Sequence, residues 1–434
     1  MLRENPRVSE RRRIGIARNI TWLASASLLV KPAWLLFIVV LCWRYLGTAG
    51  FGVFSTALWL AFIPASLTDL GLNRLTVREV ARSRPSASRY FSNVLVLRLA
   101  AAPFAWAITI GAGFALGYEA PMLWAVGWAS VYAVAMLAMT YARAFFQAFE
   151  NLRLEGISII VEKVLVIGCG VIGLITTRTA HGTLALMAIG LVVALALNLR
   201  WISRNLAKLD LRLVSIDFLK SAVVRALPLG LYAFFIVIYL RIGGVLLEYW
   251  HGEQAAGEFA PAFRILEALF LLPAVFSAAI LPRLSTLYHE GRIQEFRLVF
   301  SKSLSVALGL SVIIAAGISS LAPEIMALAN PDEPQTDPAR ILSMLVWVFP
   351  LMTTKDLLII SLIASDRQRF LAWGLGAAVS LAIALHFVFT LKEGAGGLVT
   401  VFFVVESLVV CLCFVQLFYV IAANRQNLSS AEIG

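Results

Sequence analysis

The stretch YLGTAGFGVFSTA, residues Tyr45–Ala57, recurs in altered form as WHGEQAAGEFAPA, residues Trp250–Ala262. The two stretches align at a constant offset of 205 residues, which brings glycine, phenylalanine and alanine positions into register. The matched pairs are Gly47 with Gly252, Gly52 with Gly257, Phe54 with Phe259, Ala57 with Ala262 and, further along, Arg78 with Arg283. This pattern predicts an internal duplication, in which the two halves of the chain build the same kind of structure.

Apolar runs flank both copies and continue from one end of the chain to the other. Of the 434 residues, 60% are hydrophobic, and the mean hydropathy is +0.87, whereas soluble domains are about 45–50% apolar. Each run is about 20 residues long, which is enough to cross about 30 Å of hydrocarbon as a helix. We therefore predict an all-α membrane protein without a soluble domain of useful size.

Division of the sequence at apolar runs and charge clusters predicts twelve membrane-spanning helices. Their predicted limits are 20–43, 51–72, 93–116, 122–141, 156–175, 184–199, 222–247, 259–281, 303–322, 341–364, 370–390 and 397–422. If the N-terminus is cytoplasmic, the inner segments hold 25 Lys and Arg residues and the outer loops hold four. Because cytoplasmic loops carry an excess of Lys and Arg, both termini are predicted to be cytoplasmic.

The same distribution explains the net charge of +11. Most of the basic residues lie beside the inner leaflet, where anionic lipids attract them. Membrane lipids are therefore the expected partners of these basic residues, and the net charge does not indicate a nucleic-acid partner. The four histidines and four cysteines are scattered along the chain, so the sequence predicts no metal site and no disulfide framework.

The duplication and the span count together predict two lobes. The N-terminal six-helix lobe covers 1–200, a basic cytoplasmic linker covers 201–221, and the C-terminal six-helix lobe covers 222–434. Because six is an even number, both lobes have the same orientation and are related by a pseudo-two-fold axis along the membrane normal, as in transporters with parallel repeats. Such lobes enclose a central cavity that can open alternately to each side of the membrane.

Charged residues inside the predicted spans are the candidates for function, because such residues usually face the bundle interior or a water-filled cavity. The basic ones are Lys31, Arg98, Lys163, Arg225, Arg241, Arg264 and Lys355. The acidic ones are Asp69, Glu162, Glu267, Asp356 and Glu406. The basic residues outnumber the acidic ones, so the central cavity is predicted to be cationic.

Some of these residues also have a structural interpretation. Arg98 and Arg225 lie within a turn or two of the inner ends of their spans, where a long side chain can reach the interface. Arg264 and Glu267 are spaced i, i+3 and can pair on one helix face. For these four residues the sequence therefore does not decide between a structural role and a functional role.

Two further pairs, Glu162–Lys163 and Lys355–Asp356, are adjacent in sequence. Adjacent residues do not face each other on a helix. We therefore expect each of these side chains to find its partner on another helix or in water.

Lys31 and Arg241 are harder to explain by structure alone, because they lie deep in the helices that begin the two halves. Lys31 stands in SLLVKPAWLLF, Ser27–Phe37, where Pro32 removes the hydrogen bond to the Leu28 carbonyl and predicts a bend. Both basic residues are expected to line the cavity. Basic groups in a low dielectric attract anions, and arginine favours phosphate, so the sequence predicts transport of an anionic substrate.

Several segments resemble one family. RNITWLASASLL, RYLGTAGFGVFS and LTDLGLNRLTVREVAR resemble the opening of polysaccharide-transport proteins in the multidrug/oligosaccharidyl-lipid/polysaccharide (MOP) exporter superfamily. ARAFFQAFENLR, Ala142–Arg153, and the segment Gly257–Leu287 with its prolines Pro273 and Pro282 resemble later parts of the same proteins. The resemblance covers essentially the whole chain, although its motifs are mostly glycine, proline and apolar positions.

This resemblance implies a lipid-linked oligosaccharide flippase of the Wzx-like O-antigen type in a bacterial inner membrane. The implied substrate is a polyprenyl-diphosphate-linked oligosaccharide of polysaccharide or lipopolysaccharide biosynthesis, moved from the cytoplasmic to the outer leaflet. The implied partners are this substrate, membrane lipids and the glycan polymerase machinery. The resemblance implies no cofactor. It implies that transport is coupled to a H⁺ or Na⁺ gradient.

The resemblance also implies roles for the charged residues. Lys31, Arg241 and Arg264 would contact diphosphate or acidic sugars, and Lys163, Lys355 and Arg98 would complete the cationic cavity. The candidates for ion coupling are Glu162, Glu267, Asp356 and Glu406, and the sequence does not choose among them.

Two alternatives remain open. A multidrug or organic-ion antiporter of the same superfamily would suit a carboxylate deep in the first helix, and Lys31 holds that place. A membrane-embedded glycan polymerase or glycosyltransferase usually carries a large outer loop, whereas the longest outer loop here is roughly Pro323–Arg340. No paired-carboxylate, nucleotide-binding or nucleophile–base motif stands out, so we predict a transporter rather than an enzyme.

Overall fold

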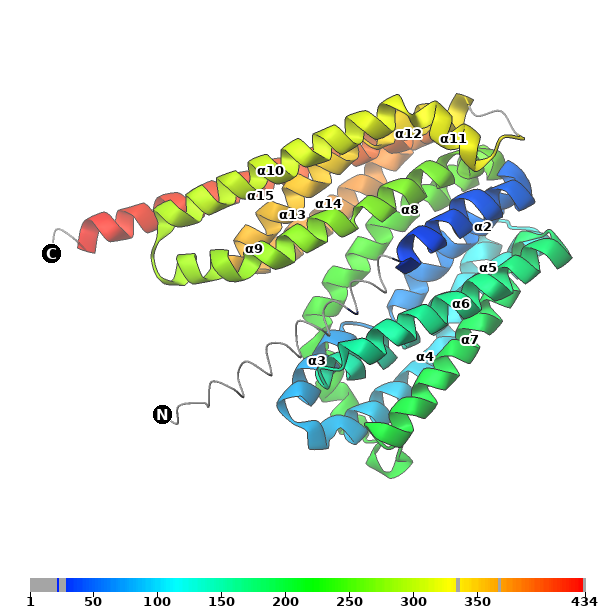
Figure 1. The fold of residues 1–434 in the computed structure, drawn as a ribbon, viewed down its shortest axis with the longest axis horizontal. Coiled ribbons are helices and arrows are strands. Elements are labelled where there is room, and N and C mark those ends of the chain that lie inside the picture. The colour runs from blue at the N-terminus through cyan, green and yellow to red at the C-terminus, as the bar shows by residue number, and fades with distance from the viewer. Residues whose placement is uncertain (1–21, 23–28, 333–335, 366–367, 432–434) are drawn as a thin grey trace. The chain divides into compact units, whose positions relative to one another are not determined.

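The structure is a computed structural model that describes residues 22, 29–332, 336–365 and 368–431 (Figure 1). Within these residues every regular element is a helix. Nine helical stretches of this described part are long and apolar enough to cross a membrane. The predicted all-α, multi-span fold is therefore confirmed.

Three of the nine stretches contain a glycine whose backbone leaves the helical range. Leu29–Ser66 bends at Gly47, Gly230–His289 bends at Gly252, and Gly376–Val420 bends at Gly394. Each of these stretches covers two of the predicted spans, with the bend in the short loop predicted between them. The nine long stretches of the described residues thus correspond to the twelve predicted spans.

The glycines of the duplicated stretch share one conformation. Gly47 has φ 69° and ψ 172°, and Gly252 has φ 82° and ψ 176°. This backbone region is essentially restricted to glycine, because a Cβ atom would clash with the neighbouring peptide groups. The two copies therefore make the same sharp bend, which supports the internal duplication predicted from the sequence.

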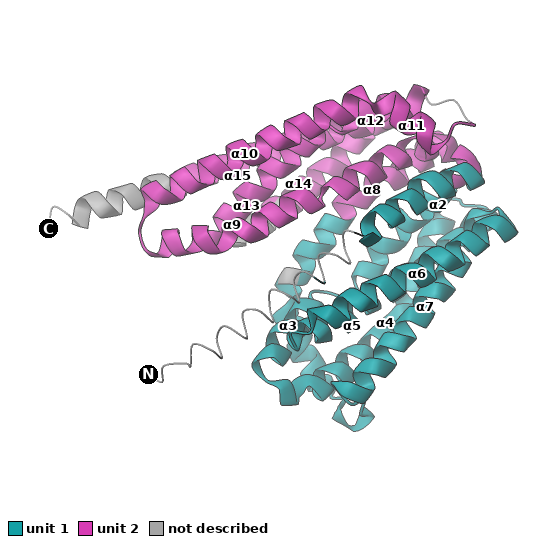
Figure 2. Cartoon of the chain, viewed as in Figure 1, with its two compact units in different colours: residues 1–46, 53–237 teal, residues 47–52, 238–434 magenta. Residues whose placement is uncertain are grey.

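The chain forms two compact units, shown in different colours in Figure 2. Unit 1 covers residues 1–46 and 53–237, and unit 2 covers residues 47–52 and 238–434. The long helices α2 and α8 therefore contribute residues to both units. The predicted lobes, 1–200 and 222–434 with a linker between them, stay a prediction.

Unit 1 is a bundle in which α5 packs against α4, α6 and α7. Its buried core includes Phe91, Tyr141 and Phe145, whose rings meet edge to face at centroid distances of 5.2 and 5.3 Å. The helices are η1 (Leu36–Cys42), α2 (Trp43–Ser66), α3 (Leu72–Arg82), η2 (Arg84–Ser86), α4 (Ala87–Ala115), α5 (Ala120–Ala148), α6 (Leu152–Thr177), α7 (Ala180–Asn205), η3 (Leu211–Leu213) and the first part of α8 (Ile216–Leu269).

Unit 2 is a bundle in which α13 packs against α9, α10 and α15. Leu284, Phe296 and Leu358 belong to its buried core. The helices are the remainder of α8, then α9 (Leu271–His289), α10 (Ile293–Ser320), α11 (Ala322–Ala329), α12 (Thr336–Leu345), α13 (Val348–Ala364), α14 (Gln368–Leu385), η4 (His386–Thr390) and α15 (Leu391–Ala431).

The bend predicted at Pro32 involves the carbonyl of Leu28, which lies outside the described residues. From Leu29 the chain is helical, and four residues after Pro32 it widens into the π-helix η1. π-helical turns insert an extra residue into a helix and are frequent at functional sites. The first span is therefore irregular directly after the lysine–proline pair.

Candidate functional site: buried charge clusters of the spanning helices

Arg98 on α4 is the centre of a buried network in unit 1, in which its Nε has no hydrogen-bond acceptor among the described residues. Its side chain is 3% exposed and forms an ion pair with Asp69. It also donates to the Leu137 carbonyl at 3.1 Å and to Asn73 Oδ1 at 2.9 Å, and its guanidinium lies 5.1 Å from the Tyr141 ring centroid. Arg98 therefore does not extend to an interface, and one acid balances its charge.

The second cluster of unit 1 surrounds Glu162 on α6. The Glu162 side chain is completely buried and forms ion pairs with Arg143 of α5 and with its neighbour Lys163, whose Nζ lies 2.9 Å from Glu162 Oε1. The Lys163 ammonium also lies 4.1 Å from the ring centroid of Trp34. The buried Glu155 also interacts electrostatically with Arg143, so two basic and two acidic side chains lie together here.

This cluster corrects one expectation and adds one residue. Glu162 finds a partner on another helix, Arg143, as expected, whereas the expectation that it does not pair with Lys163 is wrong, because the long lysine side chain reaches back to its neighbour. Arg143 was not predicted as a partner, since the fourth span was predicted to end at residue 141. Helix α5 continues to Ala148, and the apolar and aromatic residues of ARAFFQA after residue 141 are the signal that could have revealed this.

The first cluster of unit 2 lies on α8. Arg241 and Arg264 bind opposite oxygens of Glu267, Nη1 to Oε1 and Nη1 to Oε2, each at 2.8 Å. The i, i+3 pair predicted for Arg264 and Glu267 is thus confirmed, and Arg241 joins it from the other side of the Gly252 bend. All three side chains are less than 20% exposed, and Arg264 Nε is buried without a hydrogen-bond acceptor. The three side chains carry a net formal charge of +1.

The second cluster of unit 2 connects α8, α13 and α15. The Lys355 ammonium lies 2.8 Å from Glu406 Oε1, and the Tyr239 hydroxyl donates to the same oxygen at 3.0 Å. Glu406 is 1% exposed, and its second oxygen, Oε2, is buried without a hydrogen-bond partner. Asp356, next to Lys355, lies close enough to interact electrostatically with both Lys355 and Glu406.

Lys31 stands apart from these clusters. Its side chain is exposed, and it enters no ion pair with any residue that the structure describes. Arg225 is also exposed and bonds the Ser221 carbonyl and the Tyr90 hydroxyl, each at 3.3 Å. The structure thus brings the acidic candidates together with Arg241, Arg264, Lys163 and Lys355, while the place of Lys31 in a substrate cavity stays a prediction.

A comparison with protein families provides the identification. The model of the family described as "Polysaccharide biosynthesis protein" matches residues 16–288, which is more than half of the chain. The chain belongs to the polysaccharide biosynthesis protein family. The family resemblance predicted from the sequence is confirmed at this level, whereas no curated protein matched the chain.

Solved structures extend this result to the fold of the polysaccharide biosynthesis protein. The match to an inward-facing MATE family multidrug resistance transporter of the MOP superfamily covers 94% of this chain and 99% of that transporter's chain, with 16% identity and a TM-score of 0.72. A MOP superfamily transporter from Pyrococcus furiosus Vc1 (DSM3638) covers 95% and 96%, with 14% identity and a TM-score of 0.62. The MATE multidrug transporter DinF-BH covers 92% and 95%, with 16% identity and a TM-score of 0.64.

These matches show that the polysaccharide biosynthesis protein has the MOP transporter fold. The prediction of a multi-pass membrane transporter, rather than an enzyme of glycan assembly, is confirmed at the level of family and fold. Identities of 14–16% carry no information about the substrate.

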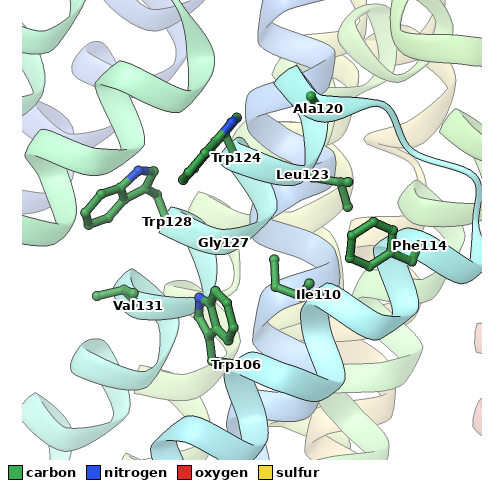
Figure 3. A pocket seen from close by; sticks show the side chains of 9 residues that line it. All are labelled: Trp106, Ile110, Phe114, Ala120, Leu123, Trp124, Gly127, Trp128 and Val131. Atoms are coloured by element: carbon green, nitrogen blue, oxygen red, sulfur yellow. The ribbon is translucent and has the colours of Figure 1, made fainter.

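A pocket of about 410 Å³ also lies on α4 and α5 of unit 1 (Figure 3). Its nine lining side chains are uncharged, and three of them are the indoles of Trp106, Trp124 and Trp128. Such a lining suits hydrocarbon and offers no counter-charge to an anion. The buried charge clusters, not this pocket, are therefore the candidate site for an anionic substrate.

Proposed function

We propose that the protein is a flippase for a polyprenyl-diphosphate-linked oligosaccharide, such as an O-antigen or related polysaccharide repeat unit. It moves this substrate from the cytoplasmic to the outer leaflet of a bacterial inner membrane. The family supports a role in polysaccharide biosynthesis, and the fold is that of MOP superfamily transporters. A substrate of this kind carries an anionic diphosphate between an apolar chain and a polar glycan, so it requires cations within the membrane.

The observation that carries the proposal is the Arg241–Arg264–Glu267 cluster. Two guanidiniums share one carboxylate, so the three side chains hold a net positive charge inside a spanning segment. The buried Nε of Arg264 also lacks an acceptor, and buried donors in native proteins are normally satisfied. A diphosphate oxygen supplies both a balancing negative charge and the missing acceptor.

The Arg143–Glu162–Lys163 cluster supports the same function from unit 1, because it holds two basic side chains within the spanning helices. We assign Lys163 and Lys31 to the approach of the diphosphate, with Trp34 holding the Lys163 ammonium in place. Asp69 balances the charge of Arg98, so we assign Arg98 to positioning α4 rather than to binding substrate.

Transport follows from alternating access. Two six-helix lobes rock about a central cationic cavity, with both termini in the cytoplasm and a H⁺ or Na⁺ gradient as the driving force. No cofactor takes part. The substrate is handed to the glycan polymerase machinery in the outer leaflet, and membrane lipids surround both lobes.

The test uses purified protein in vesicles that contain a fluorescent oligosaccharide on polyprenyl diphosphate. Flipping is measured as access of the label to a membrane-impermeant quencher. Loss of hydrogen bonds to a charged group is worth about 1.5–3 kcal/mol, so Arg264→Gln should slow flipping about ten- to hundredfold. Arg340→Gln is the matched control, because that side chain is 71% exposed in α12.

Each alternative function predicts a different outcome. Uptake of a fluorescent organic cation, with no movement of the labelled lipid, would replace the flippase with a multidrug antiporter. Formation of a longer glycan, detected by mass spectrometry, would indicate a polymerase or glycosyltransferase. Equal flipping by wild type and Arg264→Gln would remove the cluster from the substrate path.

A further inference from the structure

The α7–α8 connection, residues 206–215, is fixed against the start of α4 by hydrogen bonds from its own backbone. Lys208 N donates to Ser88 Oγ at 3.0 Å, and Asp210 N donates to Ser92 Oγ at 2.9 Å. Ser88 and Ser92 are spaced i, i+4 on α4, so their hydroxyls lie on one helix face. The connection is therefore a defined element of the surface and not a loose tether.

Asn93 of α4 continues this attachment toward α8. Its Oδ1 accepts from Ser215 N and its Nδ2 donates to the Leu213 carbonyl, each at 2.8 Å. With the two serine contacts, four backbone groups of the connection are thus satisfied within unit 1. Backbone groups that already have partners do not need water, so this part of the chain can lie against an apolar environment.

The apolar side chains of the connection are exposed. Leu209, Leu211 and Leu213 all lie at the surface, and Ile216, the first residue of α8, is 70% exposed. Apolar side chains exposed singly are normal, whereas a group of them in one short segment marks a site that binds a protein or a membrane. The connection therefore carries a binding surface that the fold itself does not use.

Basic side chains are interleaved with these apolar ones. Arg204, Lys208, Arg212 and Lys220 are all exposed, and residues 204–220 contain four basic and two acidic side chains. Lysine is depleted at protein–protein interfaces, whereas elements that lie on a membrane combine apolar side chains with Lys and Arg. The surface therefore suits anionic lipid better than a protein partner.

The apolar surface of the connection is continuous along the chain with that of the helices on either side. Val193 and Leu197 are exposed on α7, and Val224 is exposed on α8. Exposed apolar side chains on a membrane-spanning helix contact lipid. The connection thus follows and precedes lipid-facing segments, and lipid is the neighbour already present on both sides of it.

We propose that the α7–α8 connection is an anchor to the surface of a bilayer that contains anionic phospholipid. Leu209, Leu211 and Ile216 enter the edge of the hydrocarbon, as apolar faces of interfacial elements do to a depth of about 5–10 Å. Lys208 and Arg212 bind lipid phosphates. Because the connection leads directly into α8, which contributes residues to both units, the anchor holds the start of that helix at the membrane surface.

The first experiment measures where the connection lies. A spin label is attached at Leu211→Cys or Ile216→Cys in the full-length protein, with the four native cysteines replaced by alanine. In phosphatidylglycerol nanodiscs, each label should collide more often with oxygen, which dissolves in hydrocarbon, than with a water-soluble nickel chelate. Ile189→Cys, exposed in the middle of α7, is the lipid reference, and Gln294→Cys, exposed in the first turn of α10, is the aqueous reference.

The second measurement tests the attraction between the connection and anionic headgroups. In nanodiscs of phosphatidylcholine, which has no net charge, both labels should be less accessible to oxygen than in phosphatidylglycerol. High salt should reduce this difference, because salt screens exposed charges. The comparison changes only the lipid and the salt, so it stays decisive even if a charge variant folds poorly.

Substitution of single basic residues then identifies those that bind the headgroups. Each basic side chain near an anionic membrane surface changes partition about fivefold. Lys208→Gln and Arg212→Gln should therefore each lower the ratio of lipid-exposed to water-exposed label about fivefold in phosphatidylglycerol. Arg297→Gln is the matched control, because it removes an exposed charge from α10 and should leave the ratio unchanged. Melting temperatures report whether each variant is folded.

Three results would overturn the proposal. Labels as accessible to the nickel chelate as Gln294→Cys would place the connection in water. Labels that neither reagent reaches would show that protein covers the connection, either another segment of this chain or a second copy. Equal accessibility in the two lipids at low salt would remove the role of anionic phosphate. None of these measurements uses the transported substrate, so the anchor and the proposed flippase function are tested independently.

Discussion

Gly52 of α2 and Gly257 of α8 occupy equivalent positions of the duplicated stretch, and they pack directly against each other's helix. A Cβ atom at Gly52 would collide with the Glu253 carbonyl oxygen and come within 3.0 Å of Gly257 N. A Cβ atom at Gly257 would collide with the Thr48 carbonyl oxygen. The contact is therefore reciprocal between the two copies of the duplicated stretch.

This crossing predicts a strong effect of the smallest possible side chain. Gly52→Ala and Gly257→Ala should each force the backbones apart, and overpacking of this kind costs about 1–3 kcal/mol. The melting temperature of the purified protein should fall in both variants. Gly309→Ala is the matched control, because no atom lies within 4 Å of its Cβ position. That variant should be neutral or more stable, since alanine is the better helix former.

Gly252 is sensitive for a different reason. No atom lies within 4 Å of a Cβ atom there, but its φ of 82° and ψ of 176° belong to a region essentially restricted to glycine. Gly252→Ala should therefore destabilise the protein by about 1–3 kcal/mol through backbone strain alone. Comparison of its melting temperature with that of Gly309→Ala measures this cost, and equal values would show that the bend relaxes.

Sequence reasoning succeeded where one local pattern decides the structure. Apolar runs defined the spans because a bilayer demands a fixed helix length, and the spacing of Arg264 and Glu267 on one helix defined their pair. It did not identify contacts that depend on which helices become neighbours. Tyr239 and Lys355 both reach Glu406 from helices far apart in sequence, and no spacing rule predicts that meeting.

The sequence also underestimated the length of the helices. The predicted limits at residues 141 and 199 depend on charge, because a charged residue ends each apolar run. Helices α5 and α7 continue to Ala148 and Asn205, since a helix need not end where the hydrocarbon does. This is why Arg143 was counted with an inner segment although it pairs with Glu162.

The Arg98 network should be important for stability. Arg98→Met leaves Asp69 without its cation, and removal of one partner of a buried pair costs about 3–5 kcal/mol; the 20% exposure of Asp69 favours the lower end. Adding Asp69→Asn should recover part of the loss, which a double-mutant cycle of melting temperatures would reveal. Arg292→Met, which breaks a pair of residues 44% and 48% exposed, should have no measurable effect.

A substitution of Lys31 tests the cationic substrate path at a position that belongs to none of the buried charge clusters described above. In a strain that depends on this protein for glycan export, Lys31→Ala should abolish export at normal protein levels, and Lys31→Arg should retain part of it. Lys392→Ala, at an exposed position in the first turn of α15 before the Gly394 bend, should export normally. Full export by Lys31→Ala would refute a required charge at this position.

The orientation of the helices is tested by labelling of single cysteines in a variant whose four native cysteines are replaced by alanine. Ser83 and Glu119 are exposed and lie on either side of α4, a 29-residue helix about 44 Å long at 1.5 Å per residue. Ser83→Cys should react with an impermeant maleimide only after the cytoplasmic side is opened, and Glu119→Cys should react in intact cells. The reverse pattern would invert the predicted topology and place both termini outside, while labelling of both from one side would mean that α4 does not cross the membrane.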